Sequence, residues 1–240
     1  MSGRRRVLTA ASALEPSNVL ITAGPTHEPV DAVRYIANRS SGRLGIALAE
    51  AAAARHDRVT LLLGPTLSSP PQHSQVTTRR FQTTTELRDL LRDLWPDHSV
   101  LIMAAAVADY RPAHSPGNAE KRPRGDGPWM LELEPTPDLL AEAAGNARPD
   151  QLTVGFALGP ADGLLDRARE KLAAKHVDAI VANPLETMGA DSIQATLLLR
   201  DGRELSLPAC SKDRFAVWLL DRVDELRGKR PSSPAAPGSR

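Results

Sequence analysis

The sequence predicts a doubly wound α/β fold with a mostly parallel sheet and an appended antiparallel hairpin. From Asn18 onward, short apolar runs alternate with amphipathic helical stretches, which is typical of a parallel sheet with helices on both faces. Near the C-terminus two apolar runs flank Asp201-Gly202, a pair that favours a two-residue hairpin turn. A chain of 240 residues supports one well-buried core, so we expect one domain over 17–228.

Each element is predicted from its own pattern. Strands are expected over 18–24, 59–66, 99–105, 152–157 and 178–183, helices over 41–56, 84–95 and 162–176, the hairpin over 194–208, and a last helix over 211–227. Together they form a Rossmann-like sheet. Residues 1–16 and 229–240 are too poor in apolar side chains to fold, and we expect a disordered lead-in and tail.

The composition excludes several classes of protein. No apolar run approaches the roughly 18 residues of a membrane helix, and a formal charge of +1 supplies no global field for nucleic acid or an anionic membrane. Cys210 is the only cysteine, so no intrachain disulfide forms, and we assign that thiol a structural role. We expect a cytoplasmic protein that binds neither nucleic acid nor membrane.

Two connections, over 24–41 and 109–128, are too long to be simple turns and are expected to be structureless functional loops. Both leave the carboxyl ends of strands, where ligands of parallel sheets bind. The first ends in Ser40-Ser41-Gly42, where serine N-caps and the free amides behind them would form an anion site, with Arg39 and Arg43 beside it. Plain helix capping is the alternative interpretation.

Acids and lysines are the other candidates. Asp109 follows the small residues of a strand end and suits a ribose hydroxyl or a cation, while Asp138 begins a helix; for both, a turn or cap acid is the alternative. The chain has five lysines against twenty-five arginines. Lys121, and Lys171 with Lys175 on one helix face, are therefore candidate triphosphate ligands, unless they are solvated surface charges.

Other nucleotide sites have little support. The first turn is AGPTHEP rather than GxGxxG, no acid follows the second strand, and no Walker A loop occurs. An NAD(P)-dependent oxidoreductase on this sheet is thus disfavoured. Ser-His-Asp and Cys-His arrangements and metal-ligand spacings are also missing from the sequence.

Taken in order, several motifs resemble the phosphopantothenoylcysteine synthetase family, the ligase half of the bifunctional bacterial coenzyme A biosynthesis protein. They are ITAGPTHEPVDAVRYIANRSSGRLG, AAAVADYRP, the loop of Lys121, PTPDLL, VGFA, AREKLAAKHVDAIVAN and the closing hairpin. The first is the most specific, because no generic structural reason exists for so long a string.

The resemblance implies that the carboxylate of 4'-phosphopantothenate attacks the α-phosphorus of CTP, or of ATP, and releases pyrophosphate. The amine of L-cysteine then displaces the nucleoside monophosphate. Asn38 looks like the ligand of the acyl intermediate, and Lys121 like the mobile lysine that closes over the α-phosphate.

The remaining roles come from the same resemblance. Nucleotide contacts fall on Met103, Ala104, Ala105, Asp109, Lys121, Pro137, Asp138, Leu139, Leu140, Phe156, Lys171 and Lys175, and phosphopantothenate contacts on Arg34, Asn38, Ser40, Ser41, Gly42 and Ala106. We expect Mg²⁺ and a homodimer, and no FMN. We also expect a stand-alone ligase, whose product a separate decarboxylase must process. The sequence departs from the family at Arg122 to Arg124, where lysines are usual, and at Leu158 to Pro160, where a glutamate is usual. A non-catalytic nucleotide-binding paralogue is therefore the alternative.

Overall fold

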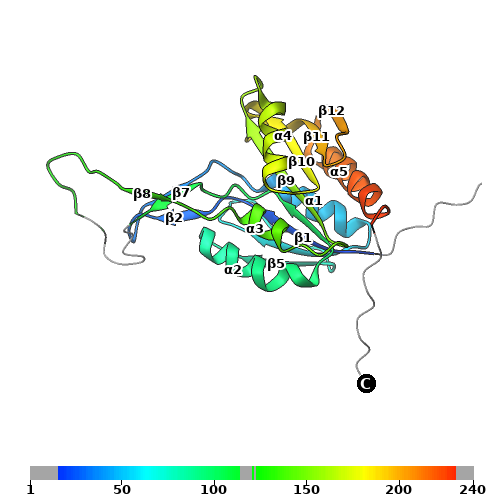
Figure 1. Ribbon diagram of the computed structural model, residues 1–240. Helices are drawn as coiled ribbons and strands as arrows, with labels where there is room; N and C mark the ends of the chain where they lie inside the picture. Colours follow the sequence, from blue (N-terminus) through cyan, green and yellow to red (C-terminus); the bar gives the residue numbers. More distant parts are fainter. Residues whose placement is uncertain (1–15, 114–120, 122, 231–240) are drawn as a thin grey trace, which may run out of the picture.

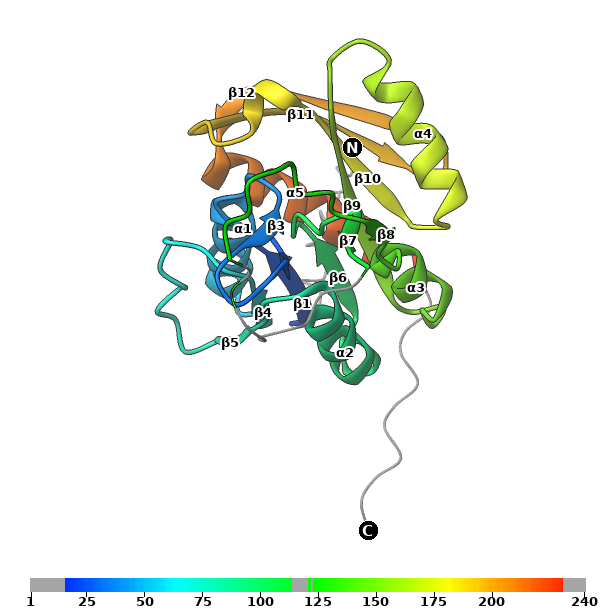
Figure 2. The ribbon, with the colours of Figure 1, turned by 90° about the vertical axis from the view of Figure 1, so that its left-hand side faces the viewer.

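The computed structural model describes residues 16–113, 121 and 123–230 and confirms the doubly wound α/β fold (Figures 1 and 2). Most of the predicted disordered lead-in and tail lies outside the described residues. The main sheet contains β1 (Asn18–Ala23), β4 (Arg58–Leu63), β5 (Val76–Arg80), β6 (Val100–Met103), β9 (Leu152–Gly159), β10 (Ala179–Pro184), β11 (Ser192–Leu199) and β12 (Glu204–Ser211). The helices are α1 (Arg43–Ala54), α2 (Thr84–Leu94), α3 (Leu139–Gly145), α4 (Leu164–Ala174) and α5 (Lys212–Arg227), with short 3₁₀ turns η1 (Trp95–Asp97) and η2 (Leu185–Thr187).

The strand order of the sheet is β12-β11-β10-β9-β6-β1-β4-β5. The six strands β5, β4, β1, β6, β9 and β10 pair in parallel, and β11 and β12 form the antiparallel hairpin at one edge. The chain starts at β1 in the middle, builds outward through β4 and β5, and returns on the other side of β1 at β6. The order therefore reverses between β1 and β6, and the carboxyl ends of these strands are where a crevice for ligands opens.

Helices cover both faces of the sheet. Alternate side chains of β1 point to opposite sides: Val19 and Ile21 pack against α1 and α5, whereas Leu20 packs in the cluster formed with α2, α3 and α4. Cys210, half-buried, packs against the first of these clusters. Two apolar layers thus hold the strand ends in a fixed arrangement.

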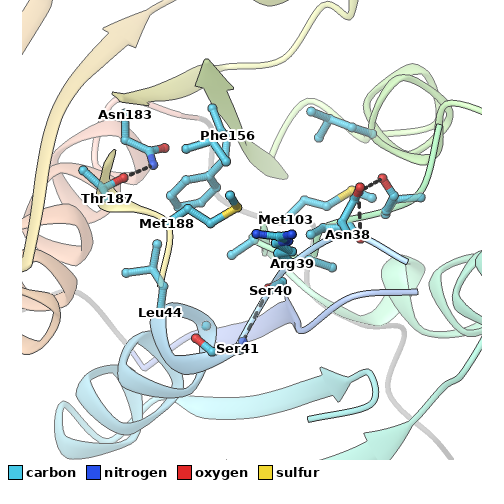
Figure 3. Close-up of a pocket in the computed structure, with 18 of the residues that line it drawn as sticks. Asn38, Arg39, Ser40, Ser41, Leu44, Met103, Phe156, Asn183, Thr187 and Met188 are labelled. Atoms are coloured by element: carbon cyan, nitrogen blue, oxygen red, sulfur yellow. Dashed lines mark hydrogen bonds between the residues drawn. The ribbon is translucent and has the colours of Figure 1, made fainter. Parts of the chain in front are cut away.

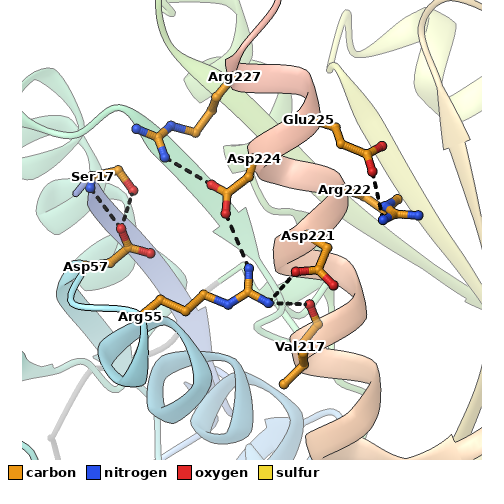
Figure 4. A network of polar contacts seen from close by, with 9 residues as sticks. All are labelled: Ser17, Arg55, Asp57, Val217, Asp221, Arg222, Asp224, Glu225 and Arg227. Carbon is orange, nitrogen blue, oxygen red and sulfur yellow. Dashed lines mark hydrogen bonds and ion pairs between the residues drawn. The ribbon is translucent and has the colours of Figure 1, made fainter. Parts of the chain in front are cut away.

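Helix α1 is held against α5 by a polar network at its C-terminal end (Figure 4). The Arg55 guanidinium donates to the carbonyl oxygen of Val217 at 2.8 Å and pairs with Asp221 at 2.6 Å and Asp224 at 3.3 Å. The first residues of these helices, Arg43 and Lys212, lie together at the opposite end. Both helices therefore begin at the same edge of the sheet.

The expectations for the hairpin turn and for the two long connections were wrong. The hairpin has a three-residue loop instead of a two-residue Asp-Gly turn: the amide of Leu199 bonds to the carbonyl oxygen of Arg203, and Gly202 takes a left-handed φ of 86°, the geometry of a turn followed by a bulge. The long connections are not structureless, because each contributes to a small two-stranded sheet. These are β2 (His27–Pro29) with β3 (Tyr35–Ala37), and β7 (Tyr110–Pro112) with β8 (Leu133–Pro135).

The close approach of α1 to β1 yields a prediction about stability. A β-carbon at Gly45 would lie 2.4 Å from the β-carbon of Ala23, whereas one at Gly145, at the end of α3, would meet no atom within 4 Å. Gly45→Ala is expected to lower the free energy of unfolding by about 1–3 kcal/mol through overpacking. Gly145→Ala, the matched control, is expected to be neutral or slightly stabilising, as alanine favours a helix. Urea denaturation of both variants checks this, and equal effects would contradict it.

Candidate active site

A cavity of about 840 Å³ opens at the carboxyl ends of the central strands, beside the beginning of α1 (Figure 3). All the residues predicted to form the site line it, except Arg34 and Lys121. They are Asn38, Ser40, Ser41, Gly42, Met103, Ala104, Ala105, Ala106, Asp109, Pro137, Asp138, Leu139, Leu140, Phe156, Lys171 and Lys175. The switch point of the sheet is therefore where the sequence candidates converge.

The beginning of α1 differs from the predicted serine cap. Its N-cap residue is Gly42, with a φ of 71°, and no side chain caps the helix. Ser40 Oγ accepts only a long bond of 3.4 Å from the Gly42 amide, and the carbonyl oxygen of Ser41 accepts bonds from Thr66 and Ser68. A glycine is needed here because a side chain at this left-handed position would be strained. Serine does not occupy the amides of the first turn, which carry the positive end of the helix dipole.

Asn38 follows β3, and its side chain reaches the backbone that leaves β6. Its amide nitrogen donates to the carbonyl oxygens of Val107 at 2.9 Å and of Ala106 at 3.4 Å. The shorter bond fixes which end of the side-chain amide faces the backbone, and the weak second bond leaves N–H capacity for a ligand. The geometry is thus compatible with the predicted contact to an acyl group.

The small residues after β6 bring the backbone close to the cavity. Amides of Ala104, Ala105 and Ala106 bond to Thr22 and Gly24 at the end of β1, at 2.9–3.1 Å. Without larger side chains in this stretch, a ligand can approach the peptide groups directly.

At the α3–α4 end of the cavity the predicted lysines already have partners. Lys171 Nζ donates to the carbonyl oxygen of Phe156 at 2.5 Å, and Lys175 pairs with Asp138 at 2.6 Å. Burial, and then the charge of Lys175, lower the pKa of Lys171. Asp138 also caps α3 by accepting from the Ala141 amide at 3.1 Å. Asp138 therefore caps α3 and also lines the cavity.

Two predicted residues lie away from the cavity. Arg34, in the turn between β2 and β3, pairs with Asp31, and its guanidinium lies 4.7 Å from the centre of the Trp129 ring. Lys121 is exposed. Its neighbours 114–120 and 122 lie outside the described residues, so the mobility of its loop stays a prediction.

Other residues of the cavity were not predicted from sequence. They include Asn183 at the end of β10, Thr187 and Met188 in and after η2, and Lys212 at the start of α5. Asn183 Nδ2 donates to Thr187 Oγ1 at 2.8 Å (Figure 3). The position of Asn183, at the end of a buried parallel strand, was a usable signal. Lys212 follows a strand of the antiparallel hairpin, so no such rule pointed to it.

Carboxylates that could hold a metal are few in the described part of the chain. No group of three or more His, Cys, Asp or Glu residues there could bind a metal ion on its own. Asp109 lines the cavity, and the described residues give its carboxylate no hydrogen bond or ion pair. Within the same ranges no helix is long and apolar enough to cross a membrane.

The fold and the cavity define the class: a doubly wound α/β protein with a cavity at the switch point of its sheet, lined in part by lysine and arginine side chains. A family model for the DNA/pantothenate metabolism flavoprotein C-terminal domain matches residues 14–226. The chain therefore belongs to this family.

Individual relatives agree with that assignment. The coenzyme A biosynthesis bifunctional protein CoaBC of Bacillus subtilis is 38% identical over 218 residues, covering 89% of this chain and 52% of the relative. A cysteine/cysteine sulfinic acid decarboxylase of an unknown prokaryotic organism is 41% identical over 177 residues, covering 74% and 48%. The crystal structure of a CoaBC C-terminal domain matches with a TM-score of 0.75 at 32% identity, covering 90% of this chain and 98% of that one. The chain spans about half the length of the curated relatives it matches.

Asp138 gives a pH prediction. Burial, the largest effect, raises its pKa, but the hydrogen bonds from Lys175 and the Ala141 amide, with the charges of Lys175 and Lys171, outweigh it and the pKa is lowered. A lowered pKa stabilises the fold above the unfolded pKa of about 4, and that stability is lost as pH falls through the folded value.

Two variants separate the charge of Asp138 from its cap. Asp138→Ala removes both and is expected to cost about 1 kcal/mol of unfolding free energy at pH 7. Asp138→Asn keeps the cap and is expected to cost less, with a deficit that shrinks below about pH 4. Urea denaturation at several pH values measures both. A deficit of Asp138→Asn that stays constant down to pH 3 would refute the assignment.

Proposed function

We propose that the chain is a phosphopantothenate–cysteine ligase, which activates 4'-phosphopantothenate with CTP, or with ATP, and joins it to L-cysteine. One observation carries the proposal: Asn38, held by its bond to the carbonyl oxygen of Val107, lines the same cavity as the uncapped start of α1 and the lysines Lys171 and Lys175. The cavity thus combines groups that can bind anions with a neutral hydrogen-bonding group, as a carboxylate reacting with a triphosphate requires.

The reaction is written in two balanced steps. The substrate carboxylate attacks the α-phosphorus, and the bond from the α-phosphorus to the oxygen bridging it to the β-phosphate breaks. Pyrophosphate departs, and an acyl-nucleotidylate is formed. The cysteine amine then attacks the acyl carbon, the nucleoside monophosphate leaves, and the amine loses a proton as the amide forms. This chemistry requires no flavin.

The residues have separate roles in this scheme. Asn38 hydrogen-bonds the acyl group without adding charge, which suits a mixed anhydride whose phosphate already carries a negative charge. Lys121 supplies positive charge to the α-phosphate when the loop that carries it closes. Lys171, Lys175 and Asp138 hold the nucleotide, and Ala104 to Ala106 offer backbone groups at the reacting centre.

A divalent cation fits Asp109. Mg²⁺ is usually bound through one or two carboxylates together with substrate phosphates, and Asp109 is a cavity carboxylate whose oxygens the described residues do not engage. When bound, Mg²⁺ would neutralise the charge that builds up on the departing pyrophosphate.

A second candidate is a nucleotide-binding protein without turnover. Arginine and proline follow Lys121 at 122–124, and Leu158 to Pro160 carry no acid. Binding of CTP with no pyrophosphate release in the presence of both co-substrates would favour this alternative.

We also propose a homodimer, joined through the arm, which we define as residues 27–37 (β2, β3 and the turn between them), β7, β8 and residues 123–132. The arm projects from the main sheet (Figure 1) and exposes large apolar side chains: Val33 is 60% exposed, Tyr35 and Tyr110 are each 55% exposed, and Met130 is 88% exposed. Several exposed large apolar side chains on one projecting segment favour an interaction site there.

The ligase makes a kinetic prediction. Pyrophosphate release is expected to require 4'-phosphopantothenate and one preferred nucleotide, CTP or ATP. Lys121→Gln is expected to reduce the rate at least about 100-fold, because a preorganised charge at the transition state is lost. Asn38→Asp is expected to reduce it too, since a carboxylate repels the substrate carboxylate and the phosphates.

Lys229→Gln is the matched control, because Lys229 is exposed and does not line the cavity. Its rate should equal that of the wild type. No release by the wild type with either nucleotide, despite cysteine and phosphopantothenate, would overturn the ligase assignment.

The dimer makes a separate prediction. Sedimentation equilibrium is expected to give twice the 25.8 kDa chain mass, and Val33→Glu should shift the protein to the monomer, because a charge would then be buried in the interface. Leu67→Glu, at a fully exposed position outside the arm, should leave the dimer intact. A monomeric wild type, or a dimeric Val33→Glu, would contradict the proposal.

A further inference from the structure

Lys212 is the first residue of α5, and its position is unusual for a lysine. Only 9% of its surface is exposed, yet it lines the cavity beside the beginning of α1. The other lysine without a predicted role, Lys229, is exposed near the end of the same helix. Lysine is rarely buried in proteins unless it is paired, so the burial of Lys212 calls for a physical reason.

The surroundings of Lys212 disfavour its positive charge. Burial lowers its pKa, and the charge of Arg43 lowers it further, against an opposing effect of Asp191. Asp191 is engaged elsewhere, because its carboxylate pairs with Arg43 at 2.6 Å. Lys212 also occupies the first turn of a helix, where the helix dipole repels a cation.

No protein group compensates for this placement in the described part of the chain. There, the Lys212 ammonium has no hydrogen bond and no ion pair. An unpaired ammonium desolvated at a helix start beside an arginine costs stability. Such placements occur at functional sites, where a ligand of opposite charge supplies the missing partner.

The beginning of α1, beside Lys212, is also suited to bind an anion. Helix α1 begins at Gly42 with no side-chain cap, so its first amides and the positive end of its dipole are available to an anion. Arg43 adds a guanidinium that is 44% exposed. Two helix starts, a guanidinium and an ammonium therefore meet at one end of the cavity.

We propose that Lys212 is a phosphate-binding residue, which holds a substrate phosphate together with Arg43 and the first amides of α1. The identity of that phosphate rests on the proposed function: it is either the β,γ part of the nucleotide or the 4'-phosphate of phosphopantothenate. Both are multiply charged phosphates, and the arms of the test distinguish them.

Three variants test the role: Lys212→Met, which keeps the length of the side chain and removes its charge, Lys212→Arg, which keeps the charge, and Lys229→Met as the control. Isothermal titration measures the binding of inorganic pyrophosphate and of 4'-phosphopantothenate separately. Lys212→Met is expected to weaken one of the two by about 10- to 100-fold, as charge-assisted hydrogen bonds are lost. Lys212→Arg should retain part of that affinity, and Lys229→Met should change neither the affinity for pyrophosphate nor that for 4'-phosphopantothenate.

Melting temperature separates this role from a structural one. Lys212→Met is expected to melt at or above the wild-type temperature, because a partly desolvated charge without a protein partner among the described residues is removed. Weaker pyrophosphate binding assigns Lys212 to the nucleotide, and weaker phosphopantothenate binding assigns it to the 4'-phosphate. Unchanged affinity for both, or a loss of affinity that only follows a lowered melting temperature, would overturn the proposal. Because binding is measured without turnover, a wild type that fails to ligate leaves this test intact.

Discussion

The close packing of α1 on β1 is the constraint on which the cavity depends. Gly45 lies directly against Ala23, where a β-carbon would come within 2.4 Å of the β-carbon of Ala23. This glycine lets the helix approach the strand closely, and Arg55 holds the other end of the helix on α5. The uncapped start of α1 is thereby fixed at the switch point of the sheet, within reach of the backbone that leaves β6.

Charge is distributed unevenly around this fixed point. At one end of the cavity Lys171 and Lys175 are satisfied by a carbonyl oxygen and by Asp138, so that end is stable without a ligand. At the other end Lys212 and the first turn of α1 lack such partners among the described residues. Functional sites commonly hold such unfavourable arrangements, which the surrounding packing keeps in place.

Long-range patterns were readable from the sequence, whereas details set by tertiary contacts were not. The alternation of apolar strands and amphipathic helices predicted the sheet, and the rule that ligands bind at strand ends pointed to Asp109. Asn38 came from the family resemblance, and Asp138 from its place at the start of a helix. Strand β5, with the exposed sequence VTTRR, carries no hydrophobic pattern because it is an edge strand. The serine cap failed because the residue before α1 has a left-handed φ of 71°, which favours Gly42 over a serine.

The central claim is that the cavity activates a carboxylate as an acyl-nucleotidylate, and isotope exchange between labelled pyrophosphate and the nucleotide tests it most directly. Exchange reports only the first, reversible step, so it should occur without cysteine and only when 4'-phosphopantothenate is present. Label that enters the nucleotide under these conditions would support the account. Exchange that occurs equally well without phosphopantothenate would contradict it, and so would pyrophosphate release that requires cysteine.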